Sequence, residues 1–277
     1  MRNSIVWFRN DLRLHDNEAL TDAIRDNDGI IPVYIFDERI FCGKTKNGFP
    51  KTHALRAKFI IESVTDLRKS LRKLGSDLLV HVGKPEELIA QLSRKYKCSW
   101  VYCNRERTSE EVKVQDALEN KLWQIGQEVR YYRGKMLYYT ADLPFPISHC
   151  PDIFSQFRKE VEKYIPVRPP MEFIFESIET QVEAEDIGAI PDIRDFGWDE
   201  SDVKDAVFKG GETEALKQLY YYLWETDLIS TYKETRNGFL GRDYSSKFSP
   251  FLAQGCISPK KIFDEIKRYE QERTKNK

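Results

Sequence analysis

Five short apolar runs separated by helical patterns constrain the fold of this chain more than any other feature. The runs are rich in β-branched and aromatic residues, as strands buried on both faces of a parallel sheet usually are. Apolar residues recur at helical spacing between them, and Gly75 ends the longest helical pattern as its C′ residue. This order predicts an α/β domain over residues 1–135, built on a five-stranded, doubly wound parallel sheet. The predicted strands are residues 4–8, 30–36, 78–82, 100–103 and 129–132.

Polar residues follow two of these strands directly. Residues 9–11 (Arg-Asn-Asp) come after the first strand, and residues 104–106 (Asn-Arg-Glu) come after the fourth. Open parallel sheets bind ligands beyond the carboxyl ends of their strands, where the strand order reverses, and the first and fourth strands flank that point here. The two segments therefore predict a ligand site. Two alternatives stay open, because Arg9 and Asp11 could instead pair with each other or cap the next helix.

The first strand is not followed by a glycine-rich phosphate loop. Neither a G-x-G-x-x-G nor a P-loop pattern occurs there, so a dinucleotide cradled by this domain is disfavoured. Asp16 is the predicted N-cap of the first helix, and Thr108 with Glu111 predicts a capping box for the helix before the last strand.

The character of the sequence changes after Tyr139. Six prolines between residues 144 and 170 surround one short helical pattern over residues 153–164. Residues 172–205 then carry twelve acidic and two basic residues. We interpret residues 136–209 as an inter-domain connector, which is longer than compact domains usually contain without a function.

A helical second unit is predicted over residues 210–277. Residues 213–226 carry an apolar stripe at helical spacing that is more typical of a core than of a stacking platform. Ser258 with Pro259 predicts the start of a charged amphipathic helix. Three or four short helices would bury little core by themselves, so the unit is interpreted as the beginning of a larger all-α domain.

Residues 232–259 mix the composition of a linker with that of a core. The stretch holds four serines, three glycines and two prolines among several aromatic residues. Ser249 before Pro250 predicts an N-cap followed by proline at the first helical position. A helix beginning there would direct its free N–H groups and the positive end of its dipole at Ser245 and Ser246, which suits a phosphate. The alternative is a capped helix after an ordinary turn.

Composition argues against several functional classes. The chain is 40% hydrophobic and 32% charged, with no run long enough to span a membrane. A formal net charge of −1 gives no overall attraction to nucleic acid, although residues 231–277 hold eleven basic and six acidic residues. Five cysteines without C-x-x-C spacing and four scattered histidines argue against a metal site or a disulfide framework. The first strand begins at once, leaving no room for a signal peptide, so we expect a cytoplasmic protein.

Two long motifs resemble the photolyase/cryptochrome family. They are WFRNDLRLHDNEAL, on the first predicted strand, and SSKFSPFLAQGCISP, in the serine-rich stretch. Three further strings, NRERTSEEVK, LPFPISHCPDIFSQFRKEVE and YKETRNGFLGRDYSSKFSP, are similar specifically to the DASH cryptochromes, which are photolyases that favour single-stranded DNA. The resemblance runs from residue 3 to the last residue. It implies an α/β antenna domain followed by a helical FAD-binding domain.

The resemblance also implies two cofactors. A loop of the second unit would line the diphosphate and ribityl side of FAD, and Glu106 would contact a methenyltetrahydrofolate antenna between the two domains. Phe251 and Gln254 stand where the family more usually has tryptophan and a small or apolar residue, so packing near the loop is expected to differ. The FAD residues that the resemblance implies are Tyr232, Ser245, Ser246, Lys247, Phe248 and Ser249.

The family's chemistry is light-driven DNA repair. A reduced flavin donates an electron to a cyclobutane pyrimidine dimer flipped out of the strand, the ring splits, and the electron returns. The implied partner is damaged, single-stranded DNA, bound by a monomer, and no residue of this chain is assigned a catalytic role. Basic side chains of the second unit are candidates for phosphate contacts, or else ordinary solvated side chains. They are Arg236, Arg242, Lys247, Lys260 and Lys261.

Members of the family are usually longer, by roughly 150 to 200 residues if the helical domain has ordinary size. The resemblance therefore implies an N-terminal part of such a protein, with the dimer-binding pocket and photoreduction tryptophans beyond Lys277. We expect these residues alone to bind FAD weakly. Three functions stay open: a DASH-type photolyase, a flavin-binding light sensor without repair, and a non-catalytic module that binds folate or a nucleotide.

Overall fold

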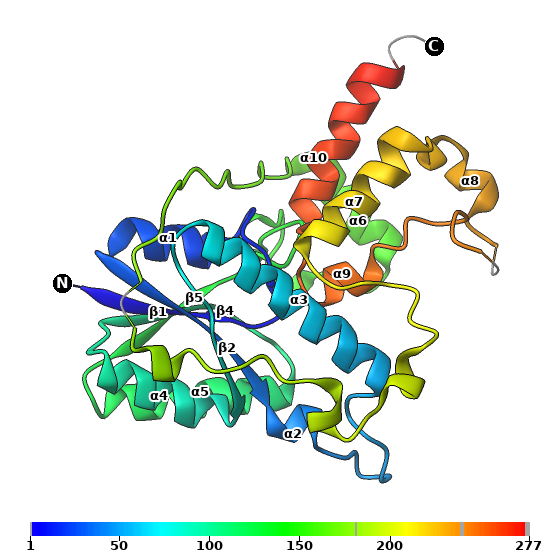
Figure 1. The fold of residues 1–277 in the computed structure, drawn as a ribbon. Coiled ribbons are helices and arrows are strands. Elements are labelled where there is room, and N and C mark those ends of the chain that lie inside the picture. The colour runs from blue at the N-terminus through cyan, green and yellow to red at the C-terminus, as the bar shows by residue number, and fades with distance from the viewer. Residues whose placement is uncertain (1, 181, 239–240, 275–277) are drawn as a thin grey trace.

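A computed structural model describes residues 2–180, 182–238 and 241–274 (Figure 1). Phe239 and Leu240 of the serine-rich stretch lie outside these residues. The strands are β1 (Asn3–Phe8), β2 (Gly29–Asp37), β3 (Leu79–Gly83), β4 (Trp100–Asn104) and β5 (Glu128–Tyr132). The helices of the first unit are α1 (Glu18–Asp26), α2 (Glu38–Phe41), α3 (Ala54–Lys73), α4 (Pro85–Lys95) and α5 (Ser109–Trp123). The later helices are α6 (Phe154–Tyr164), α7 (Glu212–Tyr220), α8 (Tyr232–Thr235), α9 (Ser249–Ala253) and α10 (Pro259–Tyr269).

The five strands form one parallel sheet in the order β3-β2-β1-β4-β5. Ser4 of β1 lies in register with Ile30 of β2 on one side and Trp100 of β4 on the other. The strand order therefore reverses between β1 and β4, as predicted. The α/β class and the five-stranded, doubly wound sheet are confirmed.

Helices cover both faces of the sheet, which explains why its strands are apolar throughout (Figure 1). On one face, Val6 and Phe8 of β1 pack with buried residues of α1 and α3. On the other face, Ile5 and Trp7 pack with buried residues of α4 and α5. Alternate side chains of one strand point to opposite faces, so both sets are removed from water.

The predicted N-cap of the first helix is wrong by one residue. Asn17, not Asp16, precedes α1 and accepts a hydrogen bond from the Leu20 N–H at 3.2 Å. Asp16 has a left-handed backbone (φ +46°), and its carboxylate lies 2.8 Å from the ammonium of Lys260. The side chain that should cap the helix is therefore engaged by a residue from the far end of the chain.

The other predicted helix ends are confirmed in position, but one of the predicted capping interactions is wrong. Gly75 adopts φ +79° just beyond the C-cap of α3, as a C′ glycine does. Thr108 is the N-cap of α5, but its hydroxyl donates to the Glu111 carboxylate at 3.0 Å and makes no bond to the helix backbone. The predicted capping box is wrong, because the two side chains bond to each other. Ser258 does cap α10, accepting the Lys261 N–H at 3.0 Å.

Residues 136–209 contain the one predicted helix, α6, and otherwise short 3-10 turns within the described part of the chain. Its later part runs along the first unit and bonds to its backbone at points from Met171 to Ile187. The Val80 N–H of edge strand β3 donates to the Ile187 carbonyl at 2.9 Å, so this connector covers an open sheet edge. The division into units at residues 135 and 209 stays a prediction.

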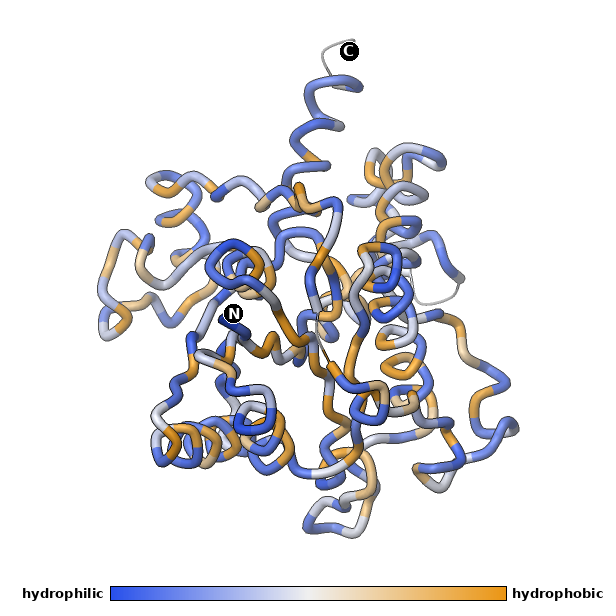
Figure 2. Tube along the Cα trace, turned by 60° about the vertical axis from the view of Figure 1, so that its left-hand side comes forward, coloured by the Kyte–Doolittle hydropathy of each residue, from blue (hydrophilic) through white to orange (hydrophobic). Residues whose placement is uncertain are grey.

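The second unit packs onto the α1/α3 face of the sheet. Leu219 and Leu223 from the α7 region and Phe251 from α9 belong to the same buried cluster as residues of β1 and α3. The outer end of α10 projects from the body, and it is largely hydrophilic (Figure 2). Across the three described ranges, no helix combines the length and hydrophobicity needed to cross a membrane.

Glu212, the first residue of α7, joins the two units through the loop between β1 and α1. Its buried carboxylate accepts hydrogen bonds from the backbone N–H groups of Leu14 at 2.8 Å and His15 at 3.0 Å, and from the His15 ring. Burial alone would raise the pKa of Glu212, but these hydrogen bonds outweigh it, and the pKa is lower than usual.

We expect Glu212→Gln to lower the free energy of unfolding at pH 7 by about 1.5–3 kcal/mol, the range for hydrogen bonds to a charged group. Because the pKa of Glu212 is lower in the folded protein, its carboxylate stabilises the fold at pH values above the unfolded-state pKa of about 4.3. This stabilisation is lost as the pH falls through the folded-state pKa. The difference between the two proteins should therefore shrink below about pH 4. Urea unfolding between pH 7 and pH 3 measures it. Glu214→Gln, on the outer side of the same helix, is the control, and an equal loss there would contradict the assignment.

Gly255 of the second unit lies directly against the backbone of the β1–α1 loop. It has φ +64°, and a Cβ atom would lie 2.1 Å from the Asn10 carbonyl oxygen. We expect Gly255→Ala to cost about 2–4 kcal/mol, because backbone strain and overpacking add. Gly126→Ala is the matched control, since Gly126 has φ +71° but a Cβ atom added to it would meet no other atom within 4 Å. Its cost should be only about 1 kcal/mol. Equal losses in urea unfolding would show that the close contact is unimportant.

Candidate functional site

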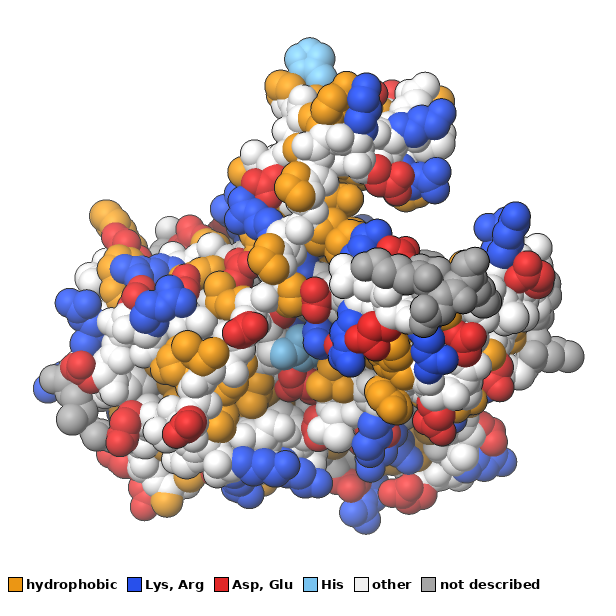
Figure 3. Space-filling view, turned by 90° about the horizontal axis from the view of Figure 1, so that it is seen from above, with side chains coloured by type: hydrophobic (Ala, Val, Ile, Leu, Met, Phe, Trp, Pro, Cys, Tyr) orange, Lys and Arg blue, Asp and Glu red, His pale blue; other side chains and the backbone are white. Residues whose placement is uncertain are grey.

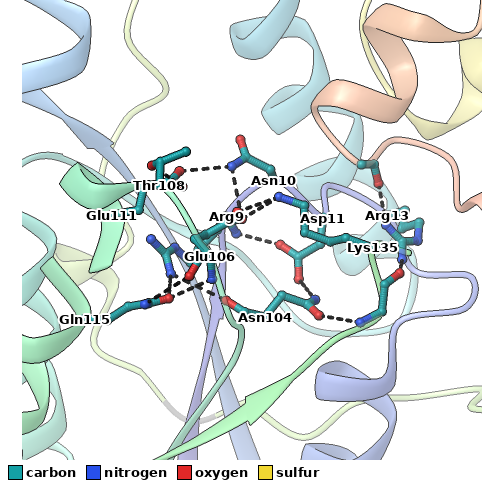
Figure 4. Close-up of polar contacts among 12 residues, drawn as sticks. Arg9, Asn10, Asp11, Arg13, Asn104, Glu106, Thr108, Glu111, Gln115 and Lys135 are labelled. Carbon is teal, nitrogen blue, oxygen red and sulfur yellow. Dashed lines mark hydrogen bonds and ion pairs between the residues drawn. The ribbon is translucent and has the colours of Figure 1, made fainter. Parts of the chain in front are cut away.

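The polar segments predicted to meet at the sheet edge do meet, together with two residues that the sequence did not indicate (Figure 4). They come from the β1–α1 loop, the segment after β4, the first half of α5 and the turn after β5. We call this group the switch cluster. Its members are Arg9, Asn10, Asp11, Asn104, Glu106, Gln115 and Lys135.

Asp11 ties the ends of β1 and β4 together. Its buried carboxylate accepts the Arg9 backbone N–H at 2.6 Å and the Asn104 side-chain amide at 2.5 Å. The Asn104 side-chain oxygen in turn accepts the Gly134 N–H at 2.9 Å, which adds the end of β5. Three neighbouring strand ends are thus held by two side chains.

The Arg9 guanidinium points away from Asp11. It donates to the Gln115 side-chain oxygen at 2.6 Å and lies 4.3 Å from the centre of the Trp7 ring. Among the described residues it forms no ion pair with Asp11, and Asp11 does not cap α1. Both structural alternatives for these residues are therefore wrong. Asp11 instead bonds the two strand ends, and Arg9 bonds Gln115 of α5.

Glu106 is the second buried carboxylate of the switch cluster, after Asp11. Its backbone is fixed by Gln115, which accepts the Glu106 N–H at 2.8 Å and donates to the Glu106 carbonyl at 3.3 Å. Its carboxylate accepts the Asn10 side-chain amide at 3.1 Å and the Lys135 ammonium at 2.6 and 2.7 Å. A carboxylate held in this way can accept hydrogen bonds from N–H donors of a ligand.

Gln115 and Lys135 were missed by the sequence reasoning. A glutamine at a buried position of an otherwise amphipathic helix is a weak signal that polar partners lie above it, and Gln115 fits that pattern. No local signal exists for Lys135. Its role depends on the turn after β5 bringing its ammonium to the carboxylate of Glu106, which follows β4.

The serine-rich loop, residues 241–249, lies beside α7. The Gln218 side chain of α7 donates to the Ser246 carbonyl at 3.1 Å and accepts from Arg242 at 2.9 Å. Lys247 has a left-handed backbone (φ +56°), and its ammonium lies 3.2 Å from the centre of the Tyr244 ring. The loop is thus anchored through its backbone, while its cations stay on the surface.

Ser249 does not cap a helix as predicted. It is the first residue of α9, the N-cap is Phe248, and no side-chain bond caps the helix. Phe248 already has helical backbone angles (φ −79°, ψ −16°), which leaves no extended residue whose hydroxyl could reach back. Because α9 has only five residues, its dipole adds little, and any anion binding must depend on Lys247 and the loop.

Tyr232 is connected to the serine-rich loop through Tyr222. It begins α8 and is 43% exposed. Tyr222 packs edge-on against Phe248 of the loop, with ring centres 5.7 Å apart. Burial, together with the nearby Tyr232, raises the pKa of Tyr222 to about 12. Tyr222 thus links Tyr232 to Phe248 of the loop, and both of these predicted FAD residues lie in the second unit, whereas Glu106, the predicted folate contact, lies in the first.

A groove of about 1260 Å³ separates this loop from the outer face of α7. Its lining mixes aromatic, cationic and acidic side chains, the last being Glu214 and Glu225, and does not include the serines of the loop. Within the described residues, neither Arg242 nor Lys247 is paired with a carboxylate, so both cations are available to an anion. These residues fit a phosphate-bearing ligand. The lining includes Phe208, Leu216, Tyr221, Arg242, Tyr244 and Lys247.

The β1–α1 loop links the switch cluster to the second unit. Its Leu12 N–H donates to the Gln254 carbonyl at 3.2 Å. The guanidinium of Arg13, which is only 1% exposed, donates to the carbonyls of Gly255 and Gly134, each at 2.9 Å. The same short segment thus carries part of the switch cluster and contacts the residues that follow α9.

One basic candidate for a DNA contact is excluded by its burial. Lys260 is 2% exposed, and its ammonium lies 2.8 Å from Asp16 and 3.1 Å from Glu18. It can neither reach a phosphate nor be solvated, so both interpretations of this residue are wrong. On the face seen in Figure 3, basic and acidic side chains are interspersed over the surface.

Three comparisons with known proteins point to one family. The sequence profile of the DNA photolyase family matches residues 4–173. Cryptochrome DASH of Gloeobacter violaceus is 46% identical over 98% of this chain and 54% of its own length. The crystal structure of a cryptochrome from Synechocystis sp. PCC6803 is 42% identical with a TM-score of 0.87, covering 99% of this chain and 56% of that one. The blue-light photoreceptor PHR2 of Arabidopsis thaliana is 38% identical over 96% of this chain and 61% of its own length.

The chain belongs to the photolyase/cryptochrome family. Identity to cryptochrome DASH extends over nearly its whole length, which makes that branch the one it resembles. The chain spans about half the length of the relatives that it matches.

Proposed function

We propose that this chain provides the antenna domain and one wall of the FAD site of a light-dependent, DASH-type photolyase. In this proposal the whole protein repairs cyclobutane pyrimidine dimers in single-stranded DNA. The observation that carries it is the 46% identity to a cryptochrome DASH over 98% of the chain, and the two long motifs also contact each other, through Leu12 and Arg13.

The switch cluster supports methenyltetrahydrofolate as the antenna ligand. The pterin ring of a folate presents adjacent N–H donors, and the buried Glu106 carboxylate offers two acceptor oxygens. Gln115 holds the Glu106 backbone so that its carboxylate keeps one position. The absorbing ring would lie at the carboxyl ends of β1 and β4, where doubly wound sheets bind ligands.

The serine-rich loop supports FAD as the second cofactor. Lys247 and Arg242 line the groove and would bind the diphosphate there, whereas the predicted contacts from Ser245 and Ser246 need a ligand that extends along the loop beyond the groove. Tyr232 would border the same site. When bound, FAD supplies the electron that splits the dimer, while the protein holds the phosphates and positions the ring.

A second candidate is a blue-light sensor that binds flavin without repairing DNA. The similarity to a protein named blue-light photoreceptor PHR2 favours it. A module that binds folate or a nucleotide without catalysis is the third. Damaged DNA as partner, a monomeric state and a cytoplasmic location complete the leading proposal.

We expect the 277 residues alone to bind FAD with a Kd of about 10 µM or weaker, because the loop supplies phosphate contacts and few contacts to the rings. Lys247→Ala should weaken this binding by about tenfold further, since it removes a charge-assisted hydrogen bond. Lys233→Ala, at an exposed position of α8, is the control. Flavin fluorescence titration measures all three, and tight stoichiometric binding by the chain would contradict the expectation.

The leading candidate and the sensor are separated by a repair assay on the full polypeptide that contains these residues. Under blue light with reduced FAD, it should remove dimers from irradiated single-stranded DNA, with less activity on duplex DNA because extruding a paired base costs more. Recovery of pyrimidine absorbance measures repair. Flavin binding without repair would favour the sensor, and a polypeptide that binds no flavin would contradict both.

A further inference from the structure

The Glu106–Lys135 ion pair in the switch cluster joins two side chains that are held very differently. The Glu106 side chain is 7% exposed, and its backbone is fixed from both sides by Gln115. The Lys135 side chain is 24% exposed and stands on the turn after β5. Its ammonium contacts both carboxylate oxygens of Glu106, at 2.6 and 2.7 Å.

Lys135 thereby occupies the acceptor positions that a ligand would use. A bidentate N–H donor needs both oxygens of the carboxylate, and the lysine contacts each of them (Figure 4). Asn10 donates to only one oxygen, at 3.1 Å, and is neutral. The ammonium is therefore the group that must move when such a ligand binds.

Displacement of the lysine is feasible, whereas displacement of the glutamate is not. A lysine has a flexible four-carbon stem, and here its side chain is the more exposed of the two, so its ammonium can return to water. The carboxylate would remain buried and must then be neutralised by the ligand, because an unpaired buried charge is costly. The ligand class that fits is a planar heterocycle with adjacent N–H donors, best with a positive charge.

We propose that Lys135 is a displaceable counter-ion, which closes Glu106 in the free protein and competes with the antenna ligand for it. The inference rests on the proposed folate site and adds a residue that sets its affinity. Lys135 does not contact the ligand in this scheme. It determines how much of the ligand's binding energy is used to break an existing ion pair.

The central test compares Lys135→Met with wild type in a fluorescence titration with 5,10-methenyltetrahydrofolate. We expect Lys135→Met to bind about tenfold more tightly or better, since no ion pair is broken on binding. Lys113→Met, at an exposed position of α5, is the matched control and should leave the affinity unchanged. If Lys135 instead contacts the ligand directly, Lys135→Met would bind more weakly, and the proposal would be overturned.

A double-mutant cycle tests whether the effect acts through Glu106. Glu106→Gln alone should weaken folate binding, because the charged acceptor is lost. Adding Lys135→Met to Glu106→Gln should then change the affinity less than about twofold, since no ion pair remains to be broken. A full tenfold gain on top of Glu106→Gln would contradict competition for the carboxylate.

A second readout is made on the wild-type protein and needs a variant only to assign the signal. The Lys135 ammonium should give a protected signal in lysine-selective proton–nitrogen NMR of the free protein, assigned by its loss in Lys135→Arg. Folate addition should abolish that protection as the ammonium enters water. Continued protection in the folate complex would overturn the proposal and leave the folate site intact. Absence of folate binding in wild type and in Lys135→Met alike would overturn both.

Discussion

The buried guanidinium of Arg13 is the interaction on which the arrangement of the two units depends. It donates to carbonyls of Gly134 and Gly255 as well as to two in its own loop, at His15 and Asp16. Without it, four carbonyl groups at the centre of the molecule would each lose a charged donor. The planar fork of arginine suits this role, because its donors point in several directions at once.

The neighbouring contacts between the units are also charged. The carboxylate of Glu212 receives two backbone N–H groups of the β1–α1 loop, and Lys260 is buried between Asp16 and Glu18. Buried ionic contacts tolerate little displacement, since a misplaced charge remains uncompensated. These charged contacts therefore fix the orientation of the two units as well as holding them together. If folate and FAD occupy the proposed sites, the same contacts also fix their separation, on which energy transfer from an antenna depends.

The sheet and its strand order were predictable because they follow from local properties of the sequence. Each of these signals can be recognised within a window of a few residues. They are the apolar runs, the helical spacing and the polar residues at the ends of β1 and β4. Asp16 shows where this reasoning fails: its composition and position suit a helix cap, but its carboxylate is bound by Lys260. The roles of Lys135 and Ser249 could not be predicted for related reasons. Lys135 binds the carboxylate of Glu106, which follows a different strand, and the backbone angles of Phe248 start α9 one residue earlier than predicted.

The two proposed cofactor sites differ in how far this chain completes them. The acceptor oxygens of Glu106 are satisfied by Asn10 and Lys135, so the antenna site is electrostatically closed before any ligand binds. At the serine-rich loop, Lys247 and Arg242 border an open groove and have no carboxylate partner among the described residues. A ligand at Glu106 must therefore replace a cation, whereas an anion at the loop gains two cations at once. Ligand affinity is limited by competition at the first site and by the small number of enclosing contacts at the second.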